Sequence, residues 1–515
     1  MKQFIDKYRN KITGTLSGFD RIVFRGIFRN LIYTGGMAIF LSYNRILLKD
    51  FDKYVKTKTT LLRSSLYNYV EQLERPSIYL QSSNTRKEKV VKEVLHEKPV
   101  TSGLICLLKC VEPCMSYSIY RNPKTKKLEL ESRQRKCLYL YFYYQHEIYG
   151  LLHIRLQTWF PFTIQICMNG REWLAQQLEK EKISYQKQDN CFLKIGNIEK
   201  ANDLMQEQVS KNFPRILNEI VNMVIKPVKA IVGNLDYYWT LHQSEWATDL
   251  MFNSVESLEQ IYPRLVRGSF ISFSSENIMR YLGKKLHGNY QGELKGNYKL
   301  RPEGMRIKYI INGNFLKMYD KKGMLLRIES VINNPYCFKV FRTTEGKPNE
   351  KPRWLLLRKG VADVKRRTEI SQKMNERYLD GLASISTDQS IKDIVADICY
   401  PSELNGNRIR ALRPWSFDDN ELLKTIGRGE YQINGFRNKD LRQYLYSEIE
   451  NANPMLKRKL SSAMTRKIRI LRAHGLVKKV VKTHRYMITE KGRRIISAIL
   501  EYQNISLKQV YNLAA

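Results

Sequence analysis

The stretch that most constrains the fold runs from Asn314 to Pro335 and reads NFLKMYDKKGMLLRIESVINNP. Apolar and polar residues alternate on both sides of Lys321-Lys322-Gly323, and a period of two is typical of a β-strand with one buried face. A Lys-Gly break between two such runs favours a tight turn. The stretch therefore predicts a two-stranded hairpin.

Charged and aromatic side chains would gather on this hairpin, because every second residue of a strand points to the same face. The side chains concerned are Lys317, Tyr319, Asp320, Lys321, Arg327 and Glu329. Two interpretations stay open. The hairpin would carry part of an active site, or it would be a basic hairpin in solvent, where Glu329 pairs with Arg327 and the cations bind phosphate.

The charge of the whole chain indicates a polyanionic partner. The 515 residues include 88 Lys and Arg against 50 Asp and Glu, a net charge of +38, and the basic residues are spread along the chain. Such a field attracts nucleic acid and releases its counterions. A membrane partner is not expected, because no long basic amphipathic helix and no membrane-spanning apolar run occurs. Eight scattered Cys favour a reducing compartment, and we expect a cytoplasmic, nucleoid-associated protein.

The pattern along the chain predicts a multidomain α+β fold, with two β-rich α+β units joined by helices and a C-terminal winged helix-turn-helix. The expected parts are an N-terminal α+β domain at 1–193, a helical region at 194–290, a β-rich unit at 291–345, a linker and basic helical region at 346–430, and the winged helix-turn-helix at 431–515.

The N-terminal part offers one candidate metal ligand. A strand is expected after Ser17-Gly18, with Asp20 at its start and Arg21 and Arg25 beside it. Two-metal nucleases often keep a carboxylate ligand at this place in a first core strand. A capping or ion-pair role for Asp20 is the alternative.

Candidate strands follow from Ser77 to Asn169, interrupted by one helix near Arg86–His96. The alternating Tyr139, Tyr141 and Tyr143 would pack in the sheet or form a platform on which bases stack. His153 and Arg155 would lie on one face of a later strand, either in contact with phosphate or on a solvated sheet face. Cys106, Cys110 and Cys114 fall on a predicted strand, where their spacing favours packing over a zinc site.

Residues 194–290 are expected to be mostly helical. His242, Glu245 and Asp249 would then line one helix face, as metal ligands or as capping and salt-bridge residues.

The C-terminal part predicts a winged helix-turn-helix. Helices are expected at Phe436–Glu448, near Pro454–Ser461 and from about Ala463 to His474, followed by two strands around Lys482-Thr483-His484 and a last helix from Glu490. Gly475 would end the third helix as a C-cap glycine. In such domains the third helix enters the major groove and the wing contacts the DNA backbone.

The segments LSGFDRIVFRG, LHIRLQTWFPF, KMYDKKGMLLRIESVINNP and HGLVKKVVKTHRYMIT together resemble a family of basic bacterial proteins that look like mobile-element genes and end in a winged helix. The hairpin also resembles the nicking domain of rolling-circle replication initiators, which has a similar Tyr-Asp-Lys strand followed by Arg-x-Glu. That resemblance implies a metal-binding role for Glu329. The chain departs from many such nickases in having no His-x-His metal pair.

These observations favour a nucleic-acid-binding protein of a mobile genetic element, acting as a metal-dependent DNA endonuclease, nickase or transposase-like enzyme. The alternative is a non-catalytic binder of structured RNA or DNA, as a ribonucleoprotein component or transcriptional regulator. Asp20, Asp320 and Glu329 would hold Mg²⁺, with Tyr319 as a further catalytic candidate. DNA is the expected partner, with a structured RNA as the alternative, and a homodimer stays open. The candidate nucleic-acid contacts are Arg21, Arg25, His153, Arg155, Arg301, Arg306, Lys308, Lys317, Lys321, Arg327, Arg466, Lys467, Arg469, Arg472, Lys478, Lys479, Lys482, His484 and Arg485.

Overall fold

The computed structural model describes residues 1–503 except 234, 274, 285–293, 302–303, 345, 347–348, 385–390, 429–430, 432–434, 447–452 and 482. The chain forms two compact units. Unit 1 consists of Met1–Thr13, Phe252–Ile328 and Lys373–Ala515, and unit 2 of Gly14–Met251 and Glu329–Gln372. Helices and strands are both abundant, so the predicted α+β class is confirmed.

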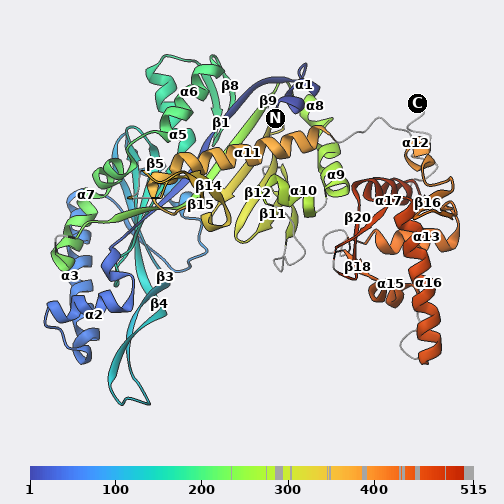
Figure 1. The fold of residues 1–515 in the computed structure, drawn as a ribbon. Coiled ribbons are helices and arrows are strands. Elements are labelled where there is room, and N and C mark those ends of the chain that lie inside the picture. The colour runs from blue at the N-terminus through green and yellow to red at the C-terminus, as the bar shows by residue number, and fades with distance from the viewer. Residues whose placement is uncertain are drawn as a thin grey trace. The chain divides into compact units, whose positions relative to one another are not determined.

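Unit 2 is built on a large mixed sheet (Figure 1). Its neighbouring strands follow the order β13 (Leu325–Ile332, of which Glu329 onward belongs to unit 2), β9 (Tyr238–Phe252), β1 (Ile12–Ile27), β6 (Ile164–Asn169), β5 (Gly150–Gln157), β4 (Leu128–His146), β3 (Gly103–Arg121) and β2 (Ser77–Leu80). The β2–β3 pair is parallel, whereas β3 to β6 and the β1–β6 pair are antiparallel. The predicted β-rich character of this part of the chain is confirmed.

Helices accompany these strands in unit 2. They are α2 (Thr34–Tyr43), α3 (Phe51–Gln72), α4 (Lys87–Glu97), α5 (Gly170–Lys180), α6 (Ile198–Val209) and α7 (Phe213–Val232). Helix α2 is apolar without a distinct polar face. Residues of α4 pack with β3 and β4 in an apolar cluster that includes Cys106, Cys110 and Cys114. The helix expected near Arg86–His96 and the packing role of these cysteines are therefore confirmed. Two small hairpins complete the unit, β7 (Tyr185–Gln188) with β8 (Cys191–Ile195) and β14 (Lys339–Arg342) with β15 (Arg353–Leu356).

The expected helical face of His242, Glu245 and Asp249 is wrong, because these residues lie on the 15-residue strand β9. The burial pattern explains the error. From Ser244 to Phe252 every residue is buried, so the period of two that marks a half-exposed strand is missing from the sequence. On a strand His242 and Glu245 point to opposite faces, and His242 is exposed.

A buried ion pair ties β9 to α5. The Arg171 guanidinium lies 2.9 Å from the Asp249 carboxylate, and both side chains are fully buried. Arg171 also donates to the Ala247 carbonyl at 3.2 Å. Next to this pair, Ser17 of β1 and Thr248 of β9 share a hydroxyl hydrogen bond of 3.1 Å, and Phe19 meets the Trp246 ring edge-on. These contacts fix β9 against β1 and α5.

Unit 1 contains the predicted hairpin. Its strands follow the order β10 (Lys295–Arg301), β11 (Gly304–Ile311), β12 (Asn314–Lys321) and β13 up to Ile328. Strands β12 and β13 are neighbours, and the turn between them places Lys322 and Gly323 at φ 58° and 70°. Asn314, Leu316 and Met318 are buried, whereas Phe315, Lys317 and Tyr319 are partly exposed. The predicted alternation of β12 is therefore confirmed.

The remaining helices before residue 400 are short, apart from one. They are α1 (Lys2–Lys7), α8 (Val255–Glu259), α9 (Tyr262–Ser272), α10 (Ser275–Tyr281), α12 (Ile391–Ala396) and the 20-residue α11 (Val364–Ala383), which begins in unit 2 and ends in unit 1.

The C-terminal part of unit 1 contains much of the order of elements that the sequence predicts, with two differences. Its elements are the β16–β17 hairpin (Ser402–Leu404, Asn407–Ile409), α13 (Phe417–Ile426), β18 (Phe436–Arg437), α15 (Asn438–Leu445), α16 (Pro454–Ala473), β19 (Val477–Lys479), β20 (Arg485–Ile488) and α17 (Glu490–Gln503). The helix expected at Phe436–Glu448 begins at Asn438, because Phe436 and Arg437 form the short strand β18, which pairs with β20. The two helices predicted at Pro454–Ser461 and Ala463–His474 form one helix, α16, because no Pro or Gly interrupts them. Gly475 follows it at φ 69°, as expected for a C-cap glycine.

Strands β19 and β20 form the expected antiparallel hairpin, and α17 begins at the expected Glu490. Whether these elements make a winged helix-turn-helix stays a prediction. Their core includes residues from Val395 to Ile499, so it extends across residue 430. No helix in the described part of the chain is long and apolar enough to cross a bilayer.

The Arg171–Asp249 pair predicts a large stability effect. Arg171→Met leaves Asp249 as a buried charge without its counterion, which costs about 3–5 kcal/mol. Urea unfolding of unit 2 would show this loss, and Arg171→Met combined with Asp249→Leu should recover most of it, because no buried charge then remains. A single variant as stable as the parent protein would contradict this expectation.

Candidate metal centre

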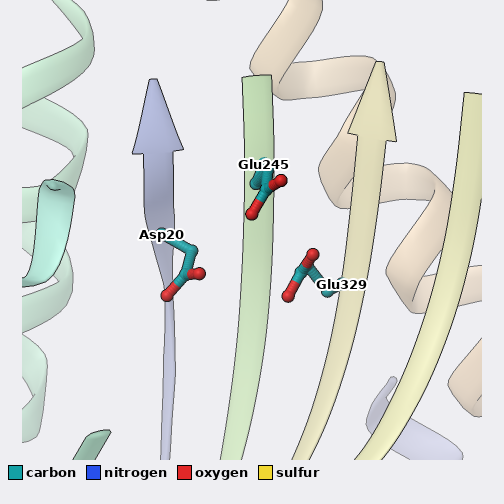
Figure 2. A group of neighbouring side chains, drawn as sticks. All are labelled: Asp20, Glu245 and Glu329. Atoms are coloured by element: carbon teal, nitrogen blue, oxygen red, sulfur yellow. The ribbon is translucent and has the colours of Figure 1, made fainter. Parts of the chain in front are cut away.

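Three carboxylates from neighbouring strands of unit 2 converge on one point. Asp20 lies on β1, Glu245 on β9 and Glu329 on β13, and these strands are consecutive in the sheet. One carboxylate oxygen of each residue lies within 4.8 Å of the other two. Figure 2 shows the three carboxylates pointing toward one another. Strands about 4.8 Å apart place such groups side by side when they occupy the same face.

The three acids are shielded from solvent to different degrees. Glu329 is 3% exposed and Glu245 9% exposed, whereas Asp20 is half-buried. Carboxylates at this separation repel one another when all of them are ionised. A cation held among them would offset that repulsion, and solvent reaches the group from the side of Asp20.

A chain of side-chain amides positions Asp20. Asn190 Nδ2 donates a short hydrogen bond to Asp20 Oδ1, and Asn169 Nδ2 donates to Asn190 Oδ1 at 2.8 Å. Asn169 is also the N-cap of α5, where its side chain accepts from the backbone N–H groups of Arg171 and Glu172. The Asp20 carboxylate is thus positioned by two successive hydrogen bonds between side chains, which start from Asn169 at the N-terminus of α5.

The first half of α11 positions the other two acids. Buried Arg367 donates to the Leu241 carbonyl of β9 at 2.7 Å and to the Ile332 carbonyl of β13. Trp246, next to Glu245, donates from Nε1 to Gln372 at 2.7 Å, and Ser330, next to Glu329, donates to the Ser371 carbonyl at 3.1 Å. One helix therefore fixes the two strands that carry Glu245 and Glu329.

Arg21 lies in the field of the carboxylates. Burial lowers the pKa of the Arg21 guanidinium. The electrostatic attraction of Cys167, Glu245 and Asp20 raises it by more, so the pKa is raised overall. Arg21 is therefore a fixed positive charge beside the acidic group.

A cavity of about 140 Å³ adjoins Asp20 and Arg21. His153 and Cys167 also line it, and burial is the main cause that lowers the pKa of His153 to about 3 and raises the pKa of Cys167 to about 11. His153 is thus neutral near pH 7. It would offer a hydrogen bond to a ligand and not the positive charge that phosphate binding would use.

The sheet register brings together two features that the sequence places apart. Tyr139, Tyr141 and Tyr143 of β4 stand opposite Gln157, Arg155 and His153 of β5. Arg25 of β1 faces Gln165 of β6, which in turn faces Arg155. Because directly paired residues share a face, the predicted contacts Arg25, His153 and Arg155 all lie on one face of the sheet.

On that face Arg155 belongs to a half-buried network. Its guanidinium lies 2.6 Å from Glu112 and 3.7 Å from the Tyr139 ring centre. Glu112 also accepts from the Tyr141 hydroxyl and lies 3.1 Å from Lys87. Burial raises the pKa of Glu112, but these hydrogen bonds and charges outweigh it, and the pKa is lowered overall. The three tyrosines are themselves buried, which favours the packing interpretation of these strands.

The hairpin residues of β12 have contacts of their own in unit 1. The Lys317 and Lys321 amines lie 5.9 and 5.6 Å from the Tyr319 ring centre. Asp320 accepts a hydrogen bond from the Gly323 N–H at 3.1 Å, so it closes the turn, and burial raises its pKa. Asp320 and Tyr319 are not members of the carboxylate group.

The other candidate contacts of unit 1 differ in exposure. Arg306 pairs with Tyr319 across β11 and β12, the Lys308 amine lies 3.5 Å from the Phe315 ring centre, and Arg327 is buried. At the C-terminal end Arg466, Arg469, Lys478, Lys479 and His484 are exposed, while Lys467, Arg472 and Arg485 are half-buried. Lys478 forms an ion pair of 2.6 Å with Glu276. Lys482 and the side chain of Arg301 lie outside the described residues.

The group therefore unites two predicted ligands, Asp20 and Glu329, with Glu245, which the sequence had offered only as part of a helix face. The signal for Glu245 was present as a carboxylate directly before the mostly apolar run WATDLMF. An acid in a buried strand needs a partner or a ligand.

The donor set fits a hard divalent cation. Carboxylate oxygens are the ligands that Mg²⁺ prefers, and neighbouring ligands of an octahedral ion bound at 2.0–2.1 Å lie about 3 Å apart. One oxygen of each of the three carboxylates lies within 4.8 Å of the other two, which is the proximity that a shared ion requires. Asp20, Glu245 and Glu329 are the residues that would hold the ion.

Comparison of the chain with protein-family models, with curated proteins and with solved structures found no significant match.

The carboxylate group predicts stabilisation by metal. At a concentration ten times its Kd, Mg²⁺ would stabilise the folded chain by about 1.4 kcal/mol, which a thermal-shift assay would detect as a rise in Tm. Glu245→Gln should abolish the rise. Asp320→Asn is the matched control, and it should keep the rise because Asp320 lies outside the group. If the rise in Tm with Mg²⁺ were lost equally in Glu245→Gln and Asp320→Asn, that result would argue against this site.

Proposed function

We propose that the protein is a metal-dependent phosphodiesterase of a mobile genetic element, an endonuclease, nickase or transposase-like enzyme that acts on DNA. The observation that supports this proposal most is the convergence of Asp20, Glu245 and Glu329 from three neighbouring strands. The net charge of +38 supports nucleic acid as the substrate.

The chemistry follows from the donor set. Asp20, Glu245 and Glu329 would hold Mg²⁺, which when bound would supply a Lewis acid for the scissile phosphate and lower the pKa of a nearby water. In hydrolysis the water oxygen forms a bond to phosphorus, the bond to one ester oxygen breaks, and that oxygen gains a proton. Asp20, Glu245 and Glu329 orient the reacting groups. Arg21 would offset the negative charge that develops on the phosphate.

The geometry shifts the expected roles of the hairpin residues. Asp320 closes a turn through the Gly323 N–H, so Glu245 replaces it in the proposed ligand set. Tyr319, with two lysine amines near its ring, fits a phosphate-contacting role better than that of a nucleophile. Attack by water or by a nucleic-acid hydroxyl needs no tyrosine.

The exposed basic residues of the C-terminal part would find the DNA. Arg466 and Arg469 lie on the exposed side of α16, opposite the buried Met464, Ile468 and Leu471. This is the helix that the winged helix-turn-helix prediction places in the major groove. A non-catalytic DNA or RNA binder is the alternative function, and it would use the same residues without the metal.

A cleavage assay separates enzyme from binder. Glu245→Gln, Glu329→Gln and Asp20→Asn should each lower Mg²⁺-dependent cleavage of single- or double-stranded DNA by about 100-fold or more, because metal catalysis contributes several kcal/mol. DNA binding measured in EDTA should stay within about twofold. Asp320→Asn is the control and should cleave normally. Cleavage that survives Glu245→Gln would remove this residue from the mechanism.

Substitution of the exposed α16 arginines tests the DNA-binding role while leaving the apolar core intact. Arg466→Ala with Arg469→Ala should weaken duplex binding and reduce the slope of log K against log salt by about 2, one unit for each phosphate that an arginine no longer neutralises. An unchanged affinity and slope would instead assign this surface to a protein partner.

A further inference from the structure

We infer that the β14–β15 hairpin of unit 2 is a stacking platform for single-stranded nucleic acid. The inference deepens the proposed function, since it assumes a nucleic-acid substrate, but it rests on different residues from the carboxylate group. The two strands form a sheet of their own, and Figure 1 labels them β14 and β15.

Two large aromatic rings stand side by side on the hairpin in contact with solvent. Phe341 of β14 pairs directly with Trp354 of β15, and their ring centres lie 5.7 Å apart. Phe341 is 60% exposed and Trp354 67% exposed. Exposing two such rings costs free energy that packing would recover. An adjacent exposed pair on a regular strand therefore indicates a ligand that covers it.

The surroundings of the rings are cationic. Lys339 lies two residues before Phe341 on the face of the rings, whereas Arg342 and Arg353 form the next pair in the register and therefore point to the other face of the same hairpin. The arginines donate to neutral oxygens, Arg342 to the Thr343 and Leu356 carbonyls and Arg353 to the Thr344 hydroxyl. These hydrogen bonds leave both charges able to attract an anion.

The sequence around the hairpin extends this pattern. From Tyr336 to Lys359 it contains seven Lys and Arg against two Glu. Tyr336 is also exposed, with the Lys359 amine 5.5 Å from its ring centre. Protein interfaces are enriched in aromatic residues but depleted in Lys. Aromatic rings interleaved with Lys and Arg are typical of proteins that bind single strands, where bases stack and cations follow the backbone.

The occupant must be single-stranded because the bases of a duplex are already stacked on one another and cannot cover the rings. The platform also follows Glu329 closely in the chain. Phe341 follows Glu329 by twelve positions, which limits the distance between the two residues to about 40 Å even for a fully extended segment. A strand that stacks on the platform would therefore be within reach of the carboxylate group of the same unit.

Fluorescence anisotropy with a labelled single-stranded 15-mer of deoxythymidine tests the platform. A duplex of equal length serves as the comparison, and both are measured in EDTA. Phe341→Ala with Trp354→Ala should weaken single-strand binding by about fivefold or more, since each base stacked on a ring contributes to affinity. The salt slope should stay the same, because stacking releases no counterions. Duplex affinity should change by less than about twofold.

Tyr400→Ala with Phe417→Ala is the matched control, because these aromatic residues are 70% and 81% exposed and lie outside the hairpin. It should bind the single strand like the parent protein. An unchanged affinity of the Phe341 and Trp354 variant would overturn the platform, and the rings would then fit a protein partner. The EDTA measurement keeps this result independent of cleavage, so failure of the metal site and failure of the platform are distinguishable.

Discussion

The convergence of Asp20, Glu245 and Glu329 from three neighbouring strands is the constraint on which the proposed site in unit 2 depends. Two unit charges about 4 Å apart repel by roughly 4 kcal/mol at an effective dielectric constant near 20. The strands nevertheless hold these carboxylate oxygens within 4.8 Å of one another. Arg367 joins β9 to β13 through two backbone carbonyls, and the buried Arg171–Asp249 pair fixes β9 against α5. Buried arginines thus fix the strands that carry Glu245 and Glu329. A metal ion would bind between the carboxylates as a further cation.

A strongly basic chain would use its charge in two ways. Arg21 lies beside the acids, and other exposed cations lie on α16 and on the β14–β15 hairpin. A polyanion attracted by the whole chain would still need a local acidic group to bring a metal ion to the phosphate. Binding would then use the positive charges on α16 and the β14–β15 hairpin, and the chemistry would use the carboxylates on β1, β9 and β13.

The sequence predicted the elements better than the site. All eight residues of β13 (Leu325–Ile332) are buried, but β12 (Asn314–Lys321) and the turn after it were predictable because alternation and a Lys-Gly turn are local signals. Strand β9 was not, because nine successive buried residues hide its period. The neighbours of β9 in the sheet are far away in the sequence, so Glu245 could not be placed next to Asp20 and Glu329. Asp320 looked equivalent to them, and only the structure shows that it closes a turn.

The central claim is that Asp20, Glu245 and Glu329 form one site for a divalent cation. A crystal of the full chain soaked in Mn²⁺, which prefers the same oxygen ligands as Mg²⁺, tests it most directly through anomalous difference density. We expect a peak at about 2.2 Å from oxygens of all three carboxylates, and its disappearance in Glu245→Gln. Anomalous peaks elsewhere, with the three carboxylates bound only to protein side chains, would contradict the claim.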